Sequence, residues 1–159
     1  MSQSSLVTYL NDHLAGGTAA LDLLDHLLEH PPPGQEAELR GLRSEIEEDK
    51  ALLLRILEEA GGRESGIRAA AARLAEKLGH AKLLLDSPGG RAFRDFEALE
   101  ALVLGIQGKA ALWRALAQVA ETLPDLARLD FADLERRAQE QFQRADRLRL
   151  EAAEKALSS

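Results

Sequence analysis

The stretch LEALVLGIQGKAALWRAL, residues 99–116, is the most apolar run of the chain, and it decides between a membrane protein and a helical protein of the aqueous phase. A membrane span needs about 20 consecutive apolar residues. Glu100 and Lys109 lie inside this run, and a charged side chain at the centre of a bilayer costs about 3 kcal/mol. The apolar residues recur every three or four positions, the period of one face of an α-helix. The stretch therefore predicts a buried helix and no membrane partner.

The same period extends outward from this stretch over nearly the whole chain. It predicts five helices, at residues about 4–30, 35–60, 65–85, 93–121 and 130–157, and no strand. Helix breakers stand between them: PPPG at 31–34, Gly61 with Gly62, and SPGG at 87–90. Asp130 precedes the fifth helix as the expected N-cap. We therefore predict an all-α fold, and 159 residues suit a single domain of this kind.

Composition narrows the function classes. The formal net charge is −7 and no run of lysine or arginine breaks the acidic balance, which argues against a nucleic-acid or anionic-lipid partner. Cysteine is absent, so disulfides, thiolate metal sites and cysteine nucleophiles are excluded. The N-terminal residues MSQSSLVTYLNDH lack the basic and apolar regions of a secretory signal. We expect a soluble protein located in the cytoplasm.

Several polar residues fall on the predicted apolar faces. His13 and Asp49 lie within the apolar stripes of the first and second helices, and Lys109 is in line with Ile106 and Trp113 on the fourth. We predict a buried polar cluster made of these residues and two that flank the fourth stripe: His13, Asp49, Glu100, Gln107 and Lys109. A buried charge must be paired. The cluster is then either structural, with Lys109 or His13 paired to a carboxylate, or a site for a metal or a small ligand.

Two pairs of glycines stand inside predicted helices, where each glycine costs about 1 kcal/mol relative to alanine. They are Gly16 and Gly17 in the first helix and Gly105 and Gly108 in the fourth. Small residues at facing positions let two backbones approach closely. We predict that the first and fourth helices cross tightly at these glycines; local bends are the alternative.

The fifth helix mixes dense charge with a thin apolar stripe, made of Leu134, Ala138, Phe142, Ala145 and Leu148. Two interpretations stay open. The helix is an outer member of the fold, covered on one side, or it carries a symmetric dimer face. The dimer face would consist of three apolar residues with interleaved arginines: Phe142, Leu148, Leu150, Arg144, Arg147 and Arg149.

Through its helix lengths and the segment GIQGKAALWRAL, residues 105–116, the chain resembles the ferritin-like superfamily, including uncharacterised bacterial members. The resemblance implies a bundle of four helices in two hairpins, joined by a crossover that contains the third helix. It also implies an iron or manganese centre built from Glu and Glu-x-x-His ligands. The second helix has no such histidine, and the fifth has no histidine at all. A smaller set of candidate ligands for one divalent ion is left, which we call the reduced ligand set: His13, Glu45, Asp49 and Glu100.

No phosphate-binding loop, dinucleotide motif, zincin motif or nucleophile elbow is present. We therefore expect no catalytic residues and a non-enzymatic structural or protein-interaction role, as a homodimer with a polar core and no metal. A metal-handling protein or oxidase that uses iron or manganese, held by the reduced ligand set, is the alternative. A third interpretation is a small-molecule binding module with its pocket near Gly105 and Trp113.

Overall fold

The computed structural model describes residues 2–63, 70–72, 76 and 89–158, and these residues form helices without any strand. The long helices are α1 (Ser2–Glu29), α2 (Glu36–Glu59), α5 (Arg91–Val119) and α7 (Phe131–Leu157). The short helices η1 (Ala120–Thr122) and α6 (Pro124–Ala127) connect α5 to α7. The predicted all-α class is confirmed. No helix in the described part is long and apolar enough to cross a membrane.

The predicted boundaries agree closely with those of the four long helices. The fourth helix was expected to reach residue 121 but ends at Val119, because a 3₁₀ turn follows and Pro124 opens a new helix at its first position. Most of the predicted helix at 65–85 lies outside the described residues. The members of that range that are described, residues 70–72 and 76, are helical.

Local hydrogen bonds explain where α2 ends and α7 begins. Gly61 adopts a φ of 80°, the left-handed conformation that suits glycine. Its N–H donates to the carbonyl of Glu58, and the N–H of Gly62 donates to the carbonyl of Leu57 at 2.9 Å. This is the Schellman pattern of a helix end. At the start of α7, the side chain of Asp130 accepts from the N–H of Asp133 at 3.0 Å, so the predicted N-cap is confirmed.

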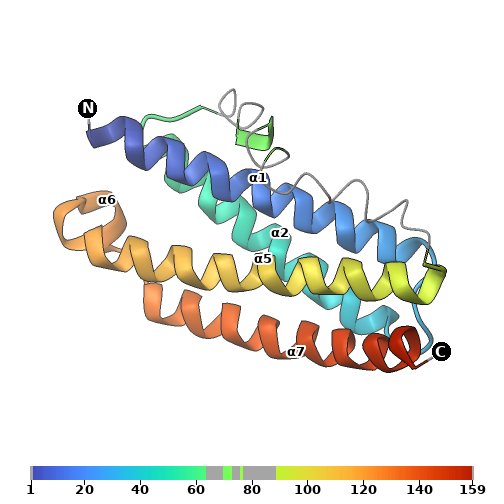
Figure 1. Cartoon of the computed structure of the whole chain (residues 1–159). Coiled ribbons are helices and arrows are strands. Elements are labelled where there is room, and N and C mark those ends of the chain that lie inside the picture. Colours follow the sequence, from blue (N-terminus) through green and yellow to red (C-terminus); the bar gives the residue numbers. More distant parts are fainter. Residues whose placement is uncertain (1, 64–69, 73–75, 77–88, 159) are drawn as a thin grey trace.

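The four long helices form two antiparallel pairs (Figure 1). One pair is α1 with α2, joined by the PPPG turn, and the other is α5 with α7. Helix α1 also packs against α5, and α2 packs against α7. Helix α2 ends beside the start of α1, whereas α5 begins at the opposite end of the molecule. The chain between α2 and α5 therefore connects opposite ends of the fold.

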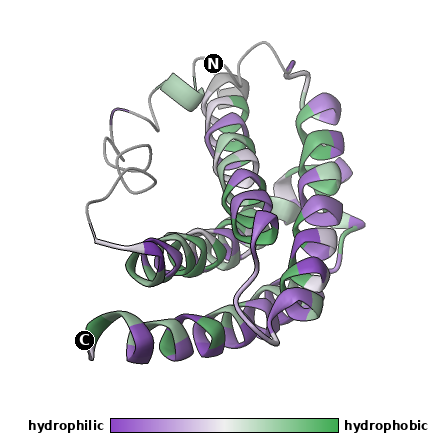
Figure 2. Cartoon of the chain, turned by 90° about the vertical axis from the view of Figure 1, so that its right-hand side faces the viewer, coloured by the Kyte–Doolittle hydropathy of each residue, from purple (hydrophilic) through white to green (hydrophobic). Residues whose placement is uncertain are grey.

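The apolar core consists of two clusters that follow one another along the helix axes. One contains residues 20–27 of α1 with 39–46 of α2, 98–106 of α5 and 145–152 of α7. The other contains residues 10–14 of α1 with 53–57 of α2, 110–116 of α5 and 131–138 of α7. Each long helix carries both hydrophobic and hydrophilic residues along its length (Figure 2). The polar side chains described next lie between the two clusters.

Helix α7 contributes to the core with a regular seven-residue spacing. Its buried residues are Phe131, Leu134, Ala138, Gln141, Ala145, Leu148 and Ala152. The steps alternate between three and four residues, as in the apolar seam of a coiled coil. The small alanines in this seam fit the extensive packing of α7 against α5.

Candidate functional site: a polar layer and the cavity beside it

Three side chains from three helices meet in the interior, and we call them the polar layer: Asp49 of α2, Lys109 of α5 and Gln141 of α7. The ammonium Nζ of Lys109 lies 2.6 Å from Oδ2 of Asp49. It also donates to Oε1 of Gln141. The amide Nε2 of Gln141 donates to the same Asp49 oxygen at 3.1 Å. Each member of the polar layer therefore contacts both of the others.

The polar layer is buried, and its charges are balanced by near neighbours. Asp49 and Gln141 are 3% and 0% exposed, and the side chain of Lys109 is 15% exposed. Burial lowers the pKa of Lys109, while the charge of Asp49 and its hydrogen bond oppose that fall. The second oxygen of Asp49 lies 3.5 Å from the guanidinium of Arg137, which also contacts Glu48 at 3.3 Å. Oδ2 of Asp49 thus accepts two hydrogen bonds, and Oδ1 faces a guanidinium, so the buried carboxylate is paired on both sides.

Only part of the predicted buried cluster comes together. Asp49 and Lys109 meet, as the prediction required. The expected burial of Glu100 and Gln107 was wrong, because both are exposed. Glu100 instead faces α7, where its carboxylate lies 3.2 Å from the guanidinium of Arg149. A residue at the edge of an apolar stripe stays exposed when the neighbouring helix covers the stripe but not the positions beside it.

Gln141 is the member of the polar layer that was not predicted. The apolar stripe assigned to this helix passed through Phe142, which is half-buried and packs against the first core cluster. The structure places Gln141 in the seam instead, at 0% exposure. The available signal was the strict alternation of three and four residues from Leu134 to Leu148, which passes through Gln141 and not through Phe142.

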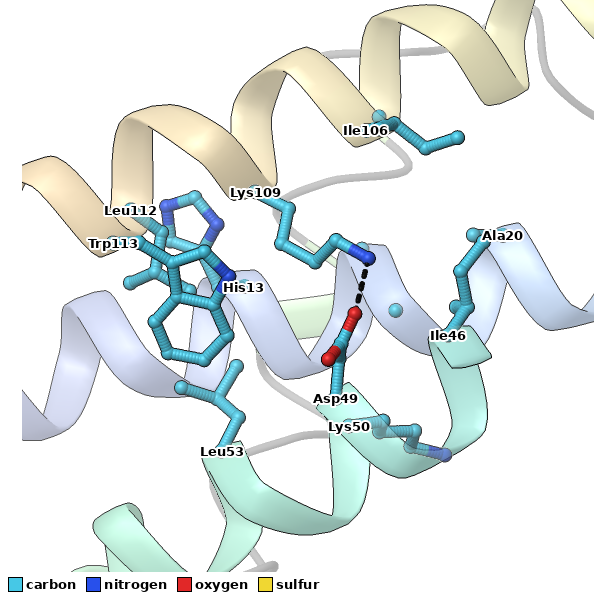
Figure 3. Close-up of a pocket in the computed structure, with 13 residues that line it drawn as sticks. His13, Ala20, Ile46, Asp49, Lys50, Leu53, Ile106, Lys109, Leu112 and Trp113 are labelled. Carbon is cyan, nitrogen blue, oxygen red and sulfur yellow. Dashed lines mark hydrogen bonds and ion pairs between the residues drawn. The ribbon is translucent and has the colours of Figure 1, made fainter. Parts of the chain in front are cut away.

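A cavity of about 60 Å³ lies beside the polar layer, between α1, α2 and α5 (Figure 3). Asp49, Lys109 and Lys50 line it, together with apolar side chains such as Leu53 and Ile106. His13 and Trp113 also line it. The predicted pocket near Gly105 and Trp113 therefore has a counterpart in the structure, because both residues line this cavity.

The two aromatic groups of the cavity differ in their polar contacts. His13 packs edge-on against the ring of Tyr9, with centroids 4.7 Å apart. Burial lowers the pKa of His13, and the nearby charge of Asp12 opposes the shift. Trp113 is 1% exposed, and its indole Nε1–H has no hydrogen-bond partner among the described residues.

The glycines do not mark a tight crossing of α1 and α5. A Cβ atom added to Gly16, Gly105 or Gly108 would have no atom of the described residues within 4 Å, beyond its own helix and chain neighbours. A Cβ on Gly17 would meet the side chain of Lys50 at 3.6 Å, which is an ordinary contact. The predicted close approach is therefore wrong. Gly16, Gly17 and Gly105 instead line the cavity, where the lack of side chains leaves space.

The six residues considered as a dimer face on α7 do not form one exposed surface. Leu148 is buried and Phe142 packs against the core. Arg144 reaches α2, where its guanidinium contacts Glu38 and lies 2.6 Å from Glu45. Among the apolar residues of the six, Leu150 alone is exposed. The interpretation of α7 as a helix covered on one side agrees with this arrangement.

The reduced metal-ligand set is dispersed. Asp49 is held by Lys109, Glu45 by Arg144 and Glu100 by Arg149. Within residues 2–63, 70–72, 76 and 89–158, no three His, Asp or Glu side chains converge as metal ligands would. His13 stands at the cavity without two further ligands of this kind in the described part.

Comparison of the chain with protein-family models, with curated proteins and with solved structures gave no match. The site consists of an ion pair in the core and a small, mostly apolar cavity, which Trp113 lines with an indole N–H that has no hydrogen-bond partner among the described residues.

Proposed function

We propose that this chain is a non-enzymatic helical protein that acts by association, and that its interior charges serve the fold and not a reaction. The observation that supports this most directly is the closed polar layer. Lys109, Asp49 and Gln141 are hydrogen-bonded to one another in the interior. A metal site or an acid–base site needs a carboxylate that is free to bind an ion or a proton, and the carboxylate of Asp49 is already paired with Lys109.

We also propose a ferritin-like arrangement for the fold. Two features support it: the antiparallel pairs α1 with α2 and α5 with α7, and the connection between opposite ends of the fold from α2 to α5. The absence of Glu-x-x-His ligands separates the chain from the metal-binding members that this resemblance implies.

A homodimer is the form of association that we propose. Three leucines supply exposed apolar surface on the α5–α7 pair: Leu104 is 62% exposed, Leu150 54% and Leu157 61%. Burial of such side chains in a contact is favourable, at about 25 cal/mol for each Å² of apolar surface. Replacement of one of these leucines with glutamate would remove that gain and place a charge in the contact.

Metal content tests the non-enzymatic part of the proposal. Protein purified without chelator or affinity metal, before and after incubation with ferrous and manganous ions, is analysed for bound metal. We expect substoichiometric metal that is the same in the wild type and in Glu45→Gln/Glu100→Gln, which leaves the polar layer intact. Stoichiometric metal in the wild type that is lost in this variant, or in His13→Ala/Asp49→Ala, would overturn the proposal in favour of a metal protein.

Light scattering over a wide range of protein concentration tests the homodimer. We expect a dimer that dissociates on dilution, and a weaker dimer for Leu104→Glu and Leu150→Glu. Gln118→Glu, an exposed polar position on the same helix as Leu104, is the matched control and should leave the dimer unchanged. A monomer at every concentration would contradict the homodimer.

A further inference from the structure

The cavity beside the polar layer has features of a binding site that the proposed association does not use. It lies between α1, α2 and α5 (Figure 3). Glycines of α1 and α5 are among the residues that line it. Gly16 is half-exposed and Gly105 is exposed, so both stand where the cavity reaches the surface. The space for a Cβ at either glycine is free of other described atoms to 4 Å. The missing side chains therefore leave a mouth between α1 and α5.

Two hydrogen-bond donors of the cavity are not used by the described residues. The first is the indole Nε1–H of Trp113, which is buried and has no partner there. The indole nitrogen lies on the side of the ring that is nearer to Lys109 and Asp49 (Figure 3). The second donor belongs to Lys109: an ammonium has three protons, and its contacts to Asp49 and Gln141 take two of them. A buried donor without an acceptor is unfavourable, and a suitable ligand atom would supply the missing acceptor.

The charge of the site selects an uncharged ligand. Lys109 and Asp49 neutralise one another, and so do Arg137 and Glu48 next to them. An ion that entered the cavity would lose its hydration without gaining a net opposite charge. The remaining wall is mostly apolar, through residues such as Leu53, Ile106 and Leu112. Lys50 also lines the cavity, but its terminal nitrogen points away from Lys109 and Asp49 (Figure 3). A carbonyl oxygen, which has two lone pairs, matches two free donors.

The size of the cavity limits the ligand to a few atoms. One water needs about 10 to 15 Å³ of such space, so the volume of about 60 Å³ admits a molecule of about four non-hydrogen atoms. We propose that this cavity is a binding site for a small uncharged carbonyl compound, such as a short amide or ketone. Trp113 and Lys109 donate to its oxygen, and the apolar wall contacts its alkyl group.

Three probes of nearly identical shape and different charge test this site: acetamide, acetate and acetamidinium. The chain contains a single tryptophan, so one indole N–H signal in a proton–nitrogen correlation spectrum reports on Trp113. We expect acetamide to shift this signal downfield in a saturable manner, and the two ions to leave it unchanged at the same concentrations. An equal response to acetate or acetamidinium would overturn the choice of an uncharged ligand. The absence of a saturable response to acetamide would overturn the site. In that case, transfer of magnetisation from a long-lived water to the indole proton would show that a bound water occupies the cavity.

Two variants separate binding from changes in the fold. Trp113→Phe keeps an aromatic ring and removes the donor; we expect acetamide to bind about tenfold more weakly, the loss of one hydrogen bond, as followed by the backbone amide signals of Gly16 and Gly105. Gly105→Leu places a side chain at the mouth, and we expect it to abolish the shift of the indole signal. Its matched control is Gly108→Leu, because Gly108 lies on the same helix with equal free space but does not line the cavity. Unchanged binding in both Trp113→Phe and Gly105→Leu would show that acetamide binds elsewhere.

Discussion

The ammonium of Lys109 and the carboxylate of Asp49 lie 2.6 Å apart between the two apolar clusters of the core. They belong to α5 and α2, helices that are not adjacent in the chain. Removing one partner would leave the other as a buried charge in apolar surroundings, which is far more costly than removing both. The energetics of the polar layer can therefore be separated by comparing single and combined substitutions.

We expect Asp49→Ala to lower the free energy of unfolding by about 3 to 5 kcal/mol. Replacement of the whole polar layer, in Asp49→Leu/Lys109→Met/Gln141→Leu, should cost much less, because no polar group is then left without a partner. Urea unfolding followed by the fluorescence of Trp113 measures both. Glu58→Ala, an exposed position on the same helix as Asp49, should change stability by less than about 0.5 kcal/mol. A small effect of Asp49→Ala would contradict the buried ion pair.

The lowered pKa of His13 predicts a stability that depends on pH. Burial favours the neutral imidazole in the folded state, whereas the unfolded chain binds the proton with an ordinary pKa of about 6.5. The free energy of unfolding should therefore fall as the pH drops below about 6.5 towards the lowered pKa, and the contribution is fully present above that range. His13→Phe should flatten this part of the profile, measured by urea unfolding at a series of pH values. His30→Asn, at the exposed end of the first hairpin, serves as the control and should keep the wild-type slope.

Glycine substitutions test the finding that α1 and α5 do not cross tightly. Gly16→Ala, Gly105→Ala and Gly108→Ala should each raise the free energy of unfolding by about 0.5 to 1 kcal/mol, because a methyl group fits and alanine favours the helix. Thermal or urea unfolding measures the change. Gly61→Ala should instead lower stability by about 1 kcal/mol or more, since its φ of 80° disfavours any side chain. If the first three variants were instead destabilised, the result would support a close crossing of α1 and α5 at these glycines.

The N-cap of α7 gives a fourth prediction. Asp130→Ala removes the acceptor of the Asp133 N–H and should lower the free energy of unfolding by about 1 kcal/mol. Asp130→Asn keeps a capping oxygen and should recover most of this loss. Equal losses in both variants, measured by urea unfolding, would show that the carboxylate charge and not the cap stabilises this helix end.

The helices could be predicted from the sequence because their signals are local. Apolar residues at helical spacing placed the four long helices, and strong breakers such as Gly61 placed their ends. The packing of these helices against one another could not be predicted in the same way. Which face of α5 meets α1 and which meets α7 depends on the rotation of each helix about its axis, which periodicity alone does not determine.

The candidate site shows the same limit at the level of single residues. Asp49 and Lys109 were found because each interrupts an apolar stripe. Glu100 was misplaced, because a position at the edge of a stripe is buried or exposed according to how far the neighbouring helix extends over it. Gln141 was missed because the predicted stripe of this helix passed through Phe142, one residue further on, although the seven-residue spacing of α7 passes through Gln141.

That spacing makes α7 nearly self-similar along its length. A shift of the helix by one repeat of seven residues, about 10.5 Å, would bring Ala138 to the place of Ala145 and Ala145 to the place of Ala152. Gln141 would then take the place of Leu148, away from Lys109 and Asp49, and would lose both of its hydrogen-bond partners. The ion pair and its amide partner thus select one axial alignment of α7 from those that the apolar residues alone would accept.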